Sequence, residues 1–201
     1  MPDPDEISAI VLAAGASRRF GSDKLLHPLT LNGMTLPLAA HSLLPWLETF
    51  SVTTVVVRSG TQAFCTAIET ALGASTAIRW IICADAGQGM AASLAAGVRA
   101  NPDAAGWLIG LADMPAIPST AIAGVLDALL AGAELAAPFC DNRRGHPVGF
   151  AAVYRAALLN LKGDTGARCL LEHDIARLAQ VEINDKGIFA DIDRPDDLQR
   201  L

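Results

Sequence analysis

Short apolar segments alternate with amphipathic ones along most of this chain of 201 residues. The apolar segments are too short for buried helices, and several are rich in β-branched residues, which predicts buried strands. We expect strands in the run that begins at Ile10, in residues 51–58, 78–84, 107–112, 133–137 and 178–183, and from Gly187 to the acidic residues near 191–193. We expect helices over residues 37–50, 62–72, 91–100, 119–130, 154–161 and 168–177, and from about Pro195 onward.

Glycine, proline and small polar residues mark the places where these elements turn or end. Asn32-Gly33 predicts a tight turn between the extended pieces of residues 29–36. Gly73 is expected to end the second helix, and Pro45 is expected to bend or interrupt the first. Ser119 is the expected N-cap of the fourth helix.

The alternation of strands and helices predicts an α/β fold with a mostly parallel sheet covered by helices on both faces. No repeat, linker or low-complexity segment divides the chain, so we expect a single domain over residues 1–201. Ligands of such folds bind beyond the carboxyl ends of the strands, near the point where the strand order reverses. This rule places residues 13–24, residues 85–90 and Asp113 along one edge of the sheet.

The composition narrows the possible partners. A net charge of −6 and a pI near 5.1 argue against nonspecific binding to nucleic acid or to a membrane surface. The four cysteines contain no CxxC pair, and we expect reduced, buried thiols; they are Cys65, Cys83, Cys140 and Cys169. The acidic, proline-bearing start does not resemble a signal peptide, and no apolar run approaches the ~20 residues of a membrane span. We therefore expect a cytoplasmic protein.

Residues 10–25, IVLAAGASRRFGSDKL, pass from an apolar run through Ala13-Ala14-Gly15 into a loop with two glycines and three cations. Backbone N–H groups and the cations Arg18, Arg19 and Lys24 could converge there on a phosphate. The spacing fits neither the phosphate-loop pattern GxxxxGK[ST] nor the fingerprint GxGxxG. On this segment alone, an ordinary surface turn explains the residues equally well.

Carboxylates recur at two places where strands are expected to end. Asp113 follows a buried strand on the same sheet edge as the glycine-containing loop, which suits a magnesium ligand that shares the ion with phosphate oxygens. Asp191 and Asp193 lie two apart in an expected extended segment and would share a face. Helix capping is the alternative role for all three carboxylates.

Three further polar segments are candidates for binding. Residues 85–90 with Ser93 would suit a base or ribose, and Arg143, Arg144 and His146 would suit an anionic substrate. Residues 162–168 form a second glycine-containing loop. Solvated loops and helix entries remain open as alternatives for all three segments.

Six motifs in one order are familiar: LAAGASRRFGSDK (12–24), GQGMAASLAAGV (87–98), LADMP (111–115), RGHPVGF (144–150), GDTGAR (163–168) and DIDRPDDL (191–198). With them the chain resembles the MobA-like NTP transferases, and among these the molybdenum cofactor cytidylyltransferases. The resemblance runs from about Ile7 to the C-terminus. It implies a Rossmann-like, three-layer α/β/α nucleotidyltransferase fold of the nucleotide-diphospho-sugar transferase type.

The resemblance also implies roles for individual residues. Arg19 and Lys24 would hold the triphosphate, and Asp113 with Asp193 or Asp191 would hold Mg²⁺ or Mn²⁺, with Asp193 slightly preferred. The implied nucleotide-binding residues are Leu12, Ala13, Ala14, Gly15, Ser17, Arg18, Gly89 and Ser93. The implied acceptor-binding residues are Arg144, Gly145, His146, Pro147, Asp164, Gly166 and Arg168. Residues 7–115 would form the nucleotide-binding half and residues 116–201 the acceptor-binding half.

The implied reaction is transfer of CMP from CTP to the terminal phosphate of a molybdopterin, with release of pyrophosphate. The LAAG motif resembles the cytidylyl branch, because the guanylyl-transferring relatives typically read LAGG. A molybdoenzyme or its chaperone would be a further partner. Three alternatives stay open: another nucleotide or phosphorylated acceptor, such as GTP or a sugar phosphate; an NADPH-dependent oxidoreductase of the nicotine-blue type; and a nucleotide-binding regulator without catalysis.

Overall fold

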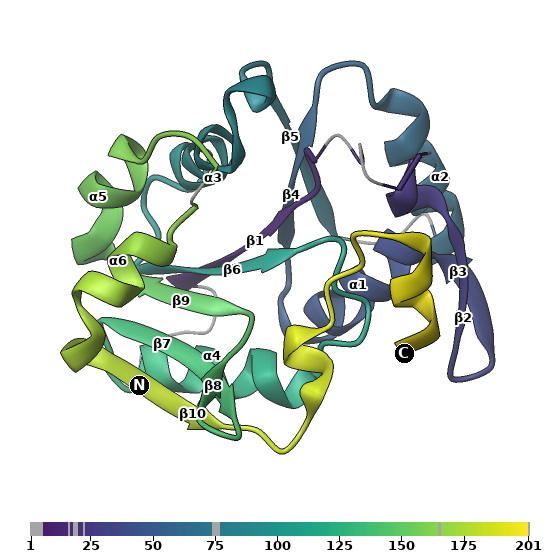
Figure 1. The fold of residues 1–201 in the computed structure, drawn as a ribbon. Helices are drawn as coiled ribbons and strands as arrows, with labels where there is room; N and C mark the ends of the chain where they lie inside the picture. Colours follow the sequence, from purple (N-terminus) through teal and green to yellow (C-terminus); the bar gives the residue numbers. More distant parts are fainter. Residues whose placement is uncertain are drawn as a thin grey trace.

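The computed structural model describes residues 6–15, 17, 20–21, 23–73, 77–164 and 166–200. In these residues a central sheet has the strand order β10-β7-β9-β6-β1-β4-β5, with β8 paired to β7 (Figure 1). The strands are β1 (Ile7–Leu12), β4 (Thr53–Arg58), β5 (Ile78–Cys83), β6 (Gly106–Leu111), β7 (Leu135–Cys140), β8 (Arg143–Arg144), β9 (Val148–Ala151) and β10 (Leu178–Glu182). A separate hairpin consists of β2 (Pro28–Leu31) and β3 (Met34–Pro37), which turn at Asn32-Gly33 as predicted.

The sheet is mixed but mostly parallel, so the predicted fold class is confirmed. β1 pairs in parallel with β4 and β6, β4 with β5, and β7 with β10. β9 lies between β6 and β7 and is antiparallel to both. The chain runs outward from β1 to β4 and β5 and then returns to β6 on the other side of β1. The strand order therefore reverses between β1 and β6, and their carboxyl ends meet where such sheets bind ligands.

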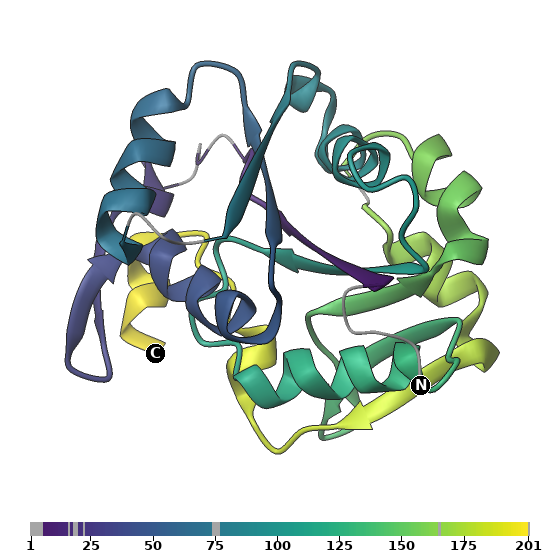
Figure 2. The ribbon, with the colours of Figure 1, turned by 180° about the vertical axis from the view of Figure 1, so that it is seen from behind.

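Helices cover both faces of the sheet (Figures 1 and 2). They are α1 (Leu38–Thr49), α2 (Gln62–Leu72), α3 (Met90–Arg99), α4 (Ser119–Leu130), α5 (Arg155–Asn160) and α6 (Arg168–His173). Short 3-10 turns are η2 (Lys24–Leu26), η3 (Ala86–Gln88), η4 (Ala152–Tyr154), η5 (Ile175–Arg177), η6 (Lys186–Phe189) and η7 (Pro195–Arg200). Within the described ranges, no helix is long and apolar enough to cross a membrane.

Alternating strand residues divide the core into two clusters, because successive side chains of a strand point to opposite faces. Ala9 and Val11 of β1 join the cluster beneath α1, α2 and α4. Ile10 and Leu12 join the cluster beneath α3, α5 and α6. The fully buried Trp46 of α1 fills the space above Gly110 of β6, where a Cβ atom would collide with the Trp46 ring.

Several local predictions were wrong or incomplete. Pro45 does not interrupt α1, which continues through it from Leu38 to Thr49. Ser119 is the first helical residue rather than the N-cap; the cap is Pro118, whose φ of −73° and ψ of 145° supply the extended residue before α4. The expected strand after Gly187 is instead the 3-10 turn η6, because the Asp185 carboxylate accepts a hydrogen bond from the Gly187 N–H at 2.7 Å.

Residues 139–144, which include the candidate anion-binding residues Arg143 and Arg144, belong to a hairpin. Asp141 and Asn142 both have positive φ values, 51° and 58°, between β7 and β8. Positive φ at both central residues is the geometry that joins antiparallel strands through two residues. The expected helix 168–177 is also divided, into α6 and η5.

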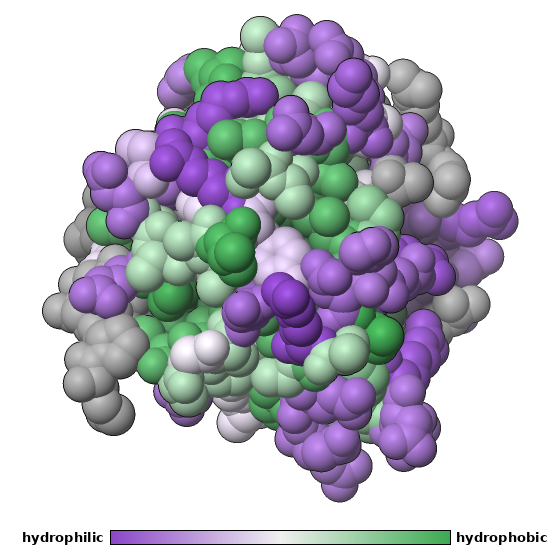
Figure 3. Space-filling model, turned by 90° about the vertical axis from the view of Figure 1, so that its left-hand side faces the viewer, coloured by the Kyte–Doolittle hydropathy of each residue, from purple (hydrophilic) through white to green (hydrophobic). Residues whose placement is uncertain are grey.

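Three of the four cysteines are buried, as expected, but Cys169 is exposed and all four are free thiols. Cys169 lies on the outer side of α6, whose neighbouring Leu171 points into the core. The side of the molecule at the left of Figure 1, which α5 and α6 cover, shows apolar residues with polar ones around them (Figure 3).

Candidate active site

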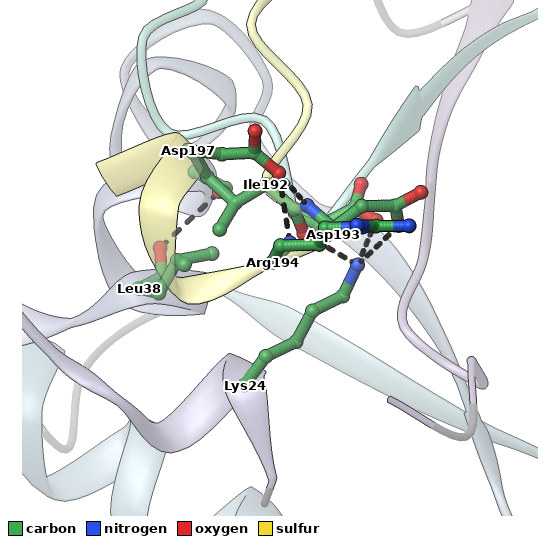
Figure 4. A network of polar contacts seen from close by, with 8 residues as sticks. Lys24, Leu38, Ile192, Asp193, Arg194 and Asp197 are labelled. Carbon is green, nitrogen blue, oxygen red and sulfur yellow. Dashed lines mark hydrogen bonds and ion pairs between the residues drawn. The ribbon is translucent and has the colours of Figure 1, made fainter. Parts of the chain in front are cut away.

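Three segments that are distant in the sequence meet at the ammonium group of Lys24 (Figure 4). Lys24 begins η2, Asp113 follows β6, and Ile192 and Asp193 lie between η6 and η7. The Lys24 Nζ donates hydrogen bonds to Asp113 Oδ2 at 2.8 Å, to the Ile192 carbonyl at 2.6 Å and to Asp193 Oδ1 at 3.2 Å. The structure thus brings Lys24, one of the three predicted cations, together with Asp113 and Asp193, two of the three predicted metal ligands.

Backbone hydrogen bonds hold the acidic segment in place. The Ile192 N–H donates to the Asp113 carbonyl at 2.9 Å, which joins the C-terminal segment to the end of β6. The Asp197 carboxylate accepts from the N–H groups of Asp193 and Arg194 at 3.0 and 2.8 Å (Figure 4). Negative charge near the start of a helical turn is favourable because unpaired N–H groups point there. Asp197 therefore fixes the backbone that presents Asp193.

The charges of Lys24, Asp113 and Asp193 act strongly on one another. Lys24 is only 8% exposed, and burial on its own lowers the pKa of an ammonium group. The charge of Asp113 and the hydrogen bonds to Asp113 and Asp193 outweigh that burial, so the pKa of Lys24 is raised above its usual value of 10.5. Asp113 Oδ1 is buried and has no hydrogen-bond partner among the described residues. This carboxylate oxygen has capacity for a further cation.

A cavity of about 740 Å³ opens beside Lys24 at the carboxyl ends of β1, β4 and β6. Many of the predicted residues line it, namely Leu12, Ala13, Ala14, Gly15, Ser17, Lys24, Gly89, Ser93, Asp113, Asp164 and Asp193. Arg58 and Ser59 also line the cavity and were not predicted. Arg58 is a cation at the end of a buried strand on the same sheet edge, and that placement was the available signal. Arg18 and Arg19 lie outside the described residues.

The two metal-ligand candidates of the C-terminal segment are placed differently. Asp193 lines the cavity and contacts Lys24. Asp191 is exposed and does not line the cavity. In irregular backbone, residues two apart do not share a face as they would in the strand that was expected here.

Gly163 and Asp164 pack on the first residues of α3. The Gly163 carbonyl accepts from the Ala91 N–H at 3.0 Å, and Asp164 Oδ1 accepts from the Met90 N–H at 3.3 Å. Gly89 has a φ of 112°, and a Cβ there would lie 2.6 Å from the Gly163 carbonyl and from Asp164 Oδ1. Glycine is required at this position, because both the backbone conformation and the close approach exclude a side chain.

Gly89→Ala is therefore expected to lower the free energy of unfolding by about 2–4 kcal/mol. Gly87 is the matched control, because a Cβ there meets nothing within 4 Å and its φ is not positive. Gly87→Ala should change stability by no more than about 0.5–1 kcal/mol. Urea denaturation of the two variants measures the difference. Equal stabilities would show that the contact between the two loops is not tight in solution.

Most of the predicted acceptor-binding residues do not line this cavity. Asp164 is the one that does, whereas Arg144, Gly145, His146, Pro147, Gly166 and Arg168 lie elsewhere. Gly145 and His146 support η6: a Cβ on Gly145 would lie 2.6 Å from the Ile188 carbonyl, and the His146 N–H donates to that carbonyl at 3.0 Å. Arg168 is exposed and pairs with Glu172 at 2.6 Å. The segment 144–147 thus holds the chain that leads to Asp193.

His146 makes stability depend on pH. Burial, reinforced by the charge of Arg144 and opposed by that of Asp191, lowers the pKa of His146 from 6.5 to about 4. The unfolded chain therefore binds a proton between pH 6.5 and 4 that the folded protein does not bind. Stability should fall as the pH falls through this window, by about 2 kcal/mol at pH 5 from this residue. Urea denaturation at pH 7 and pH 5 should show a smaller loss for His146→Gln than for the unsubstituted protein. The same loss in both proteins would contradict the shifted pKa of His146.

A cavity at the carboxyl ends of a mostly parallel sheet, with a buried cation between two carboxylates beside it, is the place where α/β proteins bind small ligands. Residues 9–181 match the model of the MobA-like NTP transferase domain, and the chain belongs to that family of nucleotidyltransferases.

Individual proteins are similar to this chain over most of its length. The chain is 30% identical over 197 residues to the purine catabolism protein PucB of Bacillus subtilis strain 168, with coverage of 94% of this chain and 92% of that protein. It superimposes with a TM-score of 0.79 on the crystal structure of a Mycobacterium sp. strain JC1 homologue of Rv0371c, at 27% identity, covering 98% and 94% of the two chains. Rv0371c of Mycobacterium tuberculosis H37Rv in complex with manganese gives a TM-score of 0.71 at 24% identity, covering 97% of each chain.

Proposed function

We propose that the protein transfers the CMP group of CTP to the terminal phosphate of a molybdopterin-type acceptor and releases pyrophosphate. The observation that carries this proposal is the position of Lys24. Its ammonium group lies between Asp113 and Asp193 at a cavity whose lining also includes Ala13, Ala14 and Gly15. A triphosphate requires cationic charge at one end of its site, and a flat base requires a wall of small residues at the other.

The residues of the site also fit a divalent metal. Among the described residues, no group of three or more His, Cys, Asp and Glu side chains could hold a metal, but Mg²⁺ does not require such a group. Mg²⁺ is typically held by one or two carboxylates and completes its coordination with phosphate oxygens, and Asp113 and Asp193 match this pattern. The buried Asp113 Oδ1, which has no hydrogen-bond partner among the described residues, could serve as a ligand. When bound, Mg²⁺ or Mn²⁺ would supply positive charge to the phosphates.

The protein contributes position and charge to the reaction. A phosphate oxygen of the acceptor attacks the α-phosphorus of CTP, a P–O bond forms, and the bond to the departing pyrophosphate breaks. Lys24 neutralises the charge that develops on the phosphates, and Arg19 is proposed to assist it. Ala13, Ala14 and Gly15 hold the base so that the α-phosphorus faces the acceptor. The attacking phosphate is already ionised at neutral pH, so the reaction requires no general base.

Two parts of the proposal rest on sequence motifs. The choice of CTP rests on Ala14 in the LAAG motif, because its methyl group, compared with glycine, narrows the base end of the cavity that it lines. The choice of acceptor rests on the RGHPVGF and GDTGAR motifs. Asp164 of the second motif lines the cavity, whereas the first motif reaches the site only through η6. The name of the relative PucB would fit a client enzyme that acts on purines.

The test is a nucleotide panel with Mg²⁺ and purified molybdopterin, scored by pyrophosphate release. We expect CTP to give a kcat/KM at least about tenfold above that for GTP, since small differences in pocket size are worth 10–200-fold. Mass spectrometry should find CMP joined to the acceptor. A preference for GTP would overturn the choice of nucleotide. Turnover with sugar phosphates but not with molybdopterin would overturn the choice of acceptor, and NADPH oxidation would indicate the reductase.

A further inference from the structure

Three oxygen atoms from two segments of the chain are directed at one point in the site, and the Lys24 Nζ occupies that point. They are Asp113 Oδ2, Asp193 Oδ1 and the carbonyl oxygen of Ile192, at 2.8, 3.2 and 2.6 Å from Nζ. The Ile192 N–H donates a hydrogen bond to the Asp113 carbonyl oxygen at 2.9 Å, and this bond fixes the backbone that carries the Ile192 carbonyl. Two carboxylates and a fixed carbonyl form an all-oxygen ligand set, which is the set that Mg²⁺ and Mn²⁺ prefer.

An ammonium group and a divalent ion cannot share this point. Each would lie within a few ångströms of the same carboxylates, where two cations repel each other strongly in a site partly shielded from water. The Lys24 side chain must move before a metal binds both carboxylates. It also lines the cavity, so its flexible four-carbon stem can direct the ammonium group toward a triphosphate there.

We propose that Lys24 occupies the divalent-metal position in the nucleotide-free protein, and that the phosphates of the nucleotide draw it away when the metal enters. The inference rests on the metal role of Asp113 and Asp193 in the proposed function. It adds the Ile192 carbonyl as a third protein oxygen and gives Lys24 a second role. In the free protein Lys24 keeps two carboxylates together without a metal, and in the loaded protein it binds phosphate. Metal and nucleotide consequently bind with positive coupling.

Lys24→Met tests the proposal, because methionine keeps most of the length of the side chain and removes its charge. The measurement is Mn²⁺ binding by titration calorimetry or electron spin resonance, without nucleotide and with a non-hydrolysable CTP analogue. We expect the nucleotide-free variant to bind Mn²⁺ at least about tenfold more tightly than the unsubstituted protein, equivalent to about 1.4 kcal/mol. The analogue should strengthen Mn²⁺ binding strongly in the unsubstituted protein and much less in the variant. Equal or weaker Mn²⁺ binding by nucleotide-free Lys24→Met would overturn the proposal.

Two controls locate the effect. Lys186→Met removes an exposed lysine, whose Nζ lies 3.7 Å from Asp141, and should leave Mn²⁺ affinity unchanged. Adding Asp113→Asn to Lys24→Met should abolish the gain in Mn²⁺ affinity. If the gain survived in the double variant, the ion would bind elsewhere and the proposal would fail.

A measurement on the unsubstituted protein covers the case in which Lys24→Met does not fold. Brief acetylation followed by peptide mass mapping reports how accessible each lysine amine is. Saturating Mn²⁺ should raise the labelling of Lys24 relative to Lys186, since the metal releases the buried amine. Unchanged labelling at Mn²⁺ saturation would contradict the exchange. The nucleotide-free Mn²⁺ affinities and the labelling of Lys24 do not depend on which nucleotide or acceptor is used, so a failure of CTP turnover alone would count against the proposed function and not against this inference.

Discussion

Replacing Asp113 with alanine is expected to lower kcat by about 10²–10³-fold, the usual cost of losing one preorganised electrostatic group. Asp113 holds the Lys24 ammonium at 2.8 Å, and its second carboxylate oxygen is buried and has no partner in the part of the chain that the structure describes. The substitution removes both the partner that positions Lys24 and the proposed metal ligand. Lys24→Ala should reduce turnover on a similar scale. Steady-state kinetics with saturating Mg²⁺ and CTP measure these losses.

Asp103→Ala is the matched control, since Asp103 is an exposed aspartate remote from the cavity lining. It should retain turnover within about twofold of the unsubstituted protein, as most surface substitutions have little effect. Circular dichroism and thermal denaturation should show that Asp113→Ala is folded. Rates within threefold of the unsubstituted protein for Asp113→Ala would remove Asp113 from the site.

Asp193→Asn and Asp191→Asn are expected to have very different effects, although the two residues are two apart. Asp193 Oδ1 lies 3.2 Å from the Lys24 Nζ and lines the cavity, so loss of its charge should reduce kcat by about 10–10²-fold. Asp191 is exposed and outside the cavity lining, so its substitution should change kcat by no more than about twofold. The same assay compares both variants directly.

Asparagine keeps the size of the side chain in both variants, so the comparison isolates the charge. Mn²⁺ titration in the presence of a CTP analogue should show weaker metal binding for Asp193→Asn only. A larger effect at Asp191 than at Asp193 would show that the segment 190–194 is arranged differently in the working enzyme.

Elements with a clear periodic pattern could be predicted from the sequence. Residues 53–58 and 106–111 could be identified as buried strands because turn residues flank them in the sequence and most of their residues on both faces are apolar or β-branched. The antiparallel direction of β9 could not be predicted, since direction depends on where the sheet has space between β6 and β7. The C-terminal segment was misread as a strand because Ile188 and Ile192 look like strand residues, but each is buried separately in the core.

The site shows a similar division. Lys24 and Asp113 could be placed on one sheet edge because Asp113 lies just after one predicted strand and Lys24 lies in the loop segment that follows another. The Ile192 carbonyl could not be found, since a backbone oxygen has no signature in the sequence and acquires a role only through its position. Arg58 was overlooked because it was assigned to the end of a strand rather than to the cavity it lines. The acceptor roles of residues 144–147 stay a prediction. In the structure Gly145 and His146 pack against Ile188 of η6, and residues 144–147 do not line the cavity.

The most direct test of the account is to follow which bond of the nucleotide breaks. CTP labelled at the α-phosphorus and CTP labelled at the γ-phosphorus are incubated separately with the protein, Mg²⁺ and molybdopterin. If CMP is transferred, the α label appears on the acceptor and the γ label leaves as pyrophosphate, and both transfers are lost in Asp113→Ala. Transfer of the γ label to the acceptor, or retention of both labels in CTP while another nucleotide reacts, would contradict the transfer of CMP.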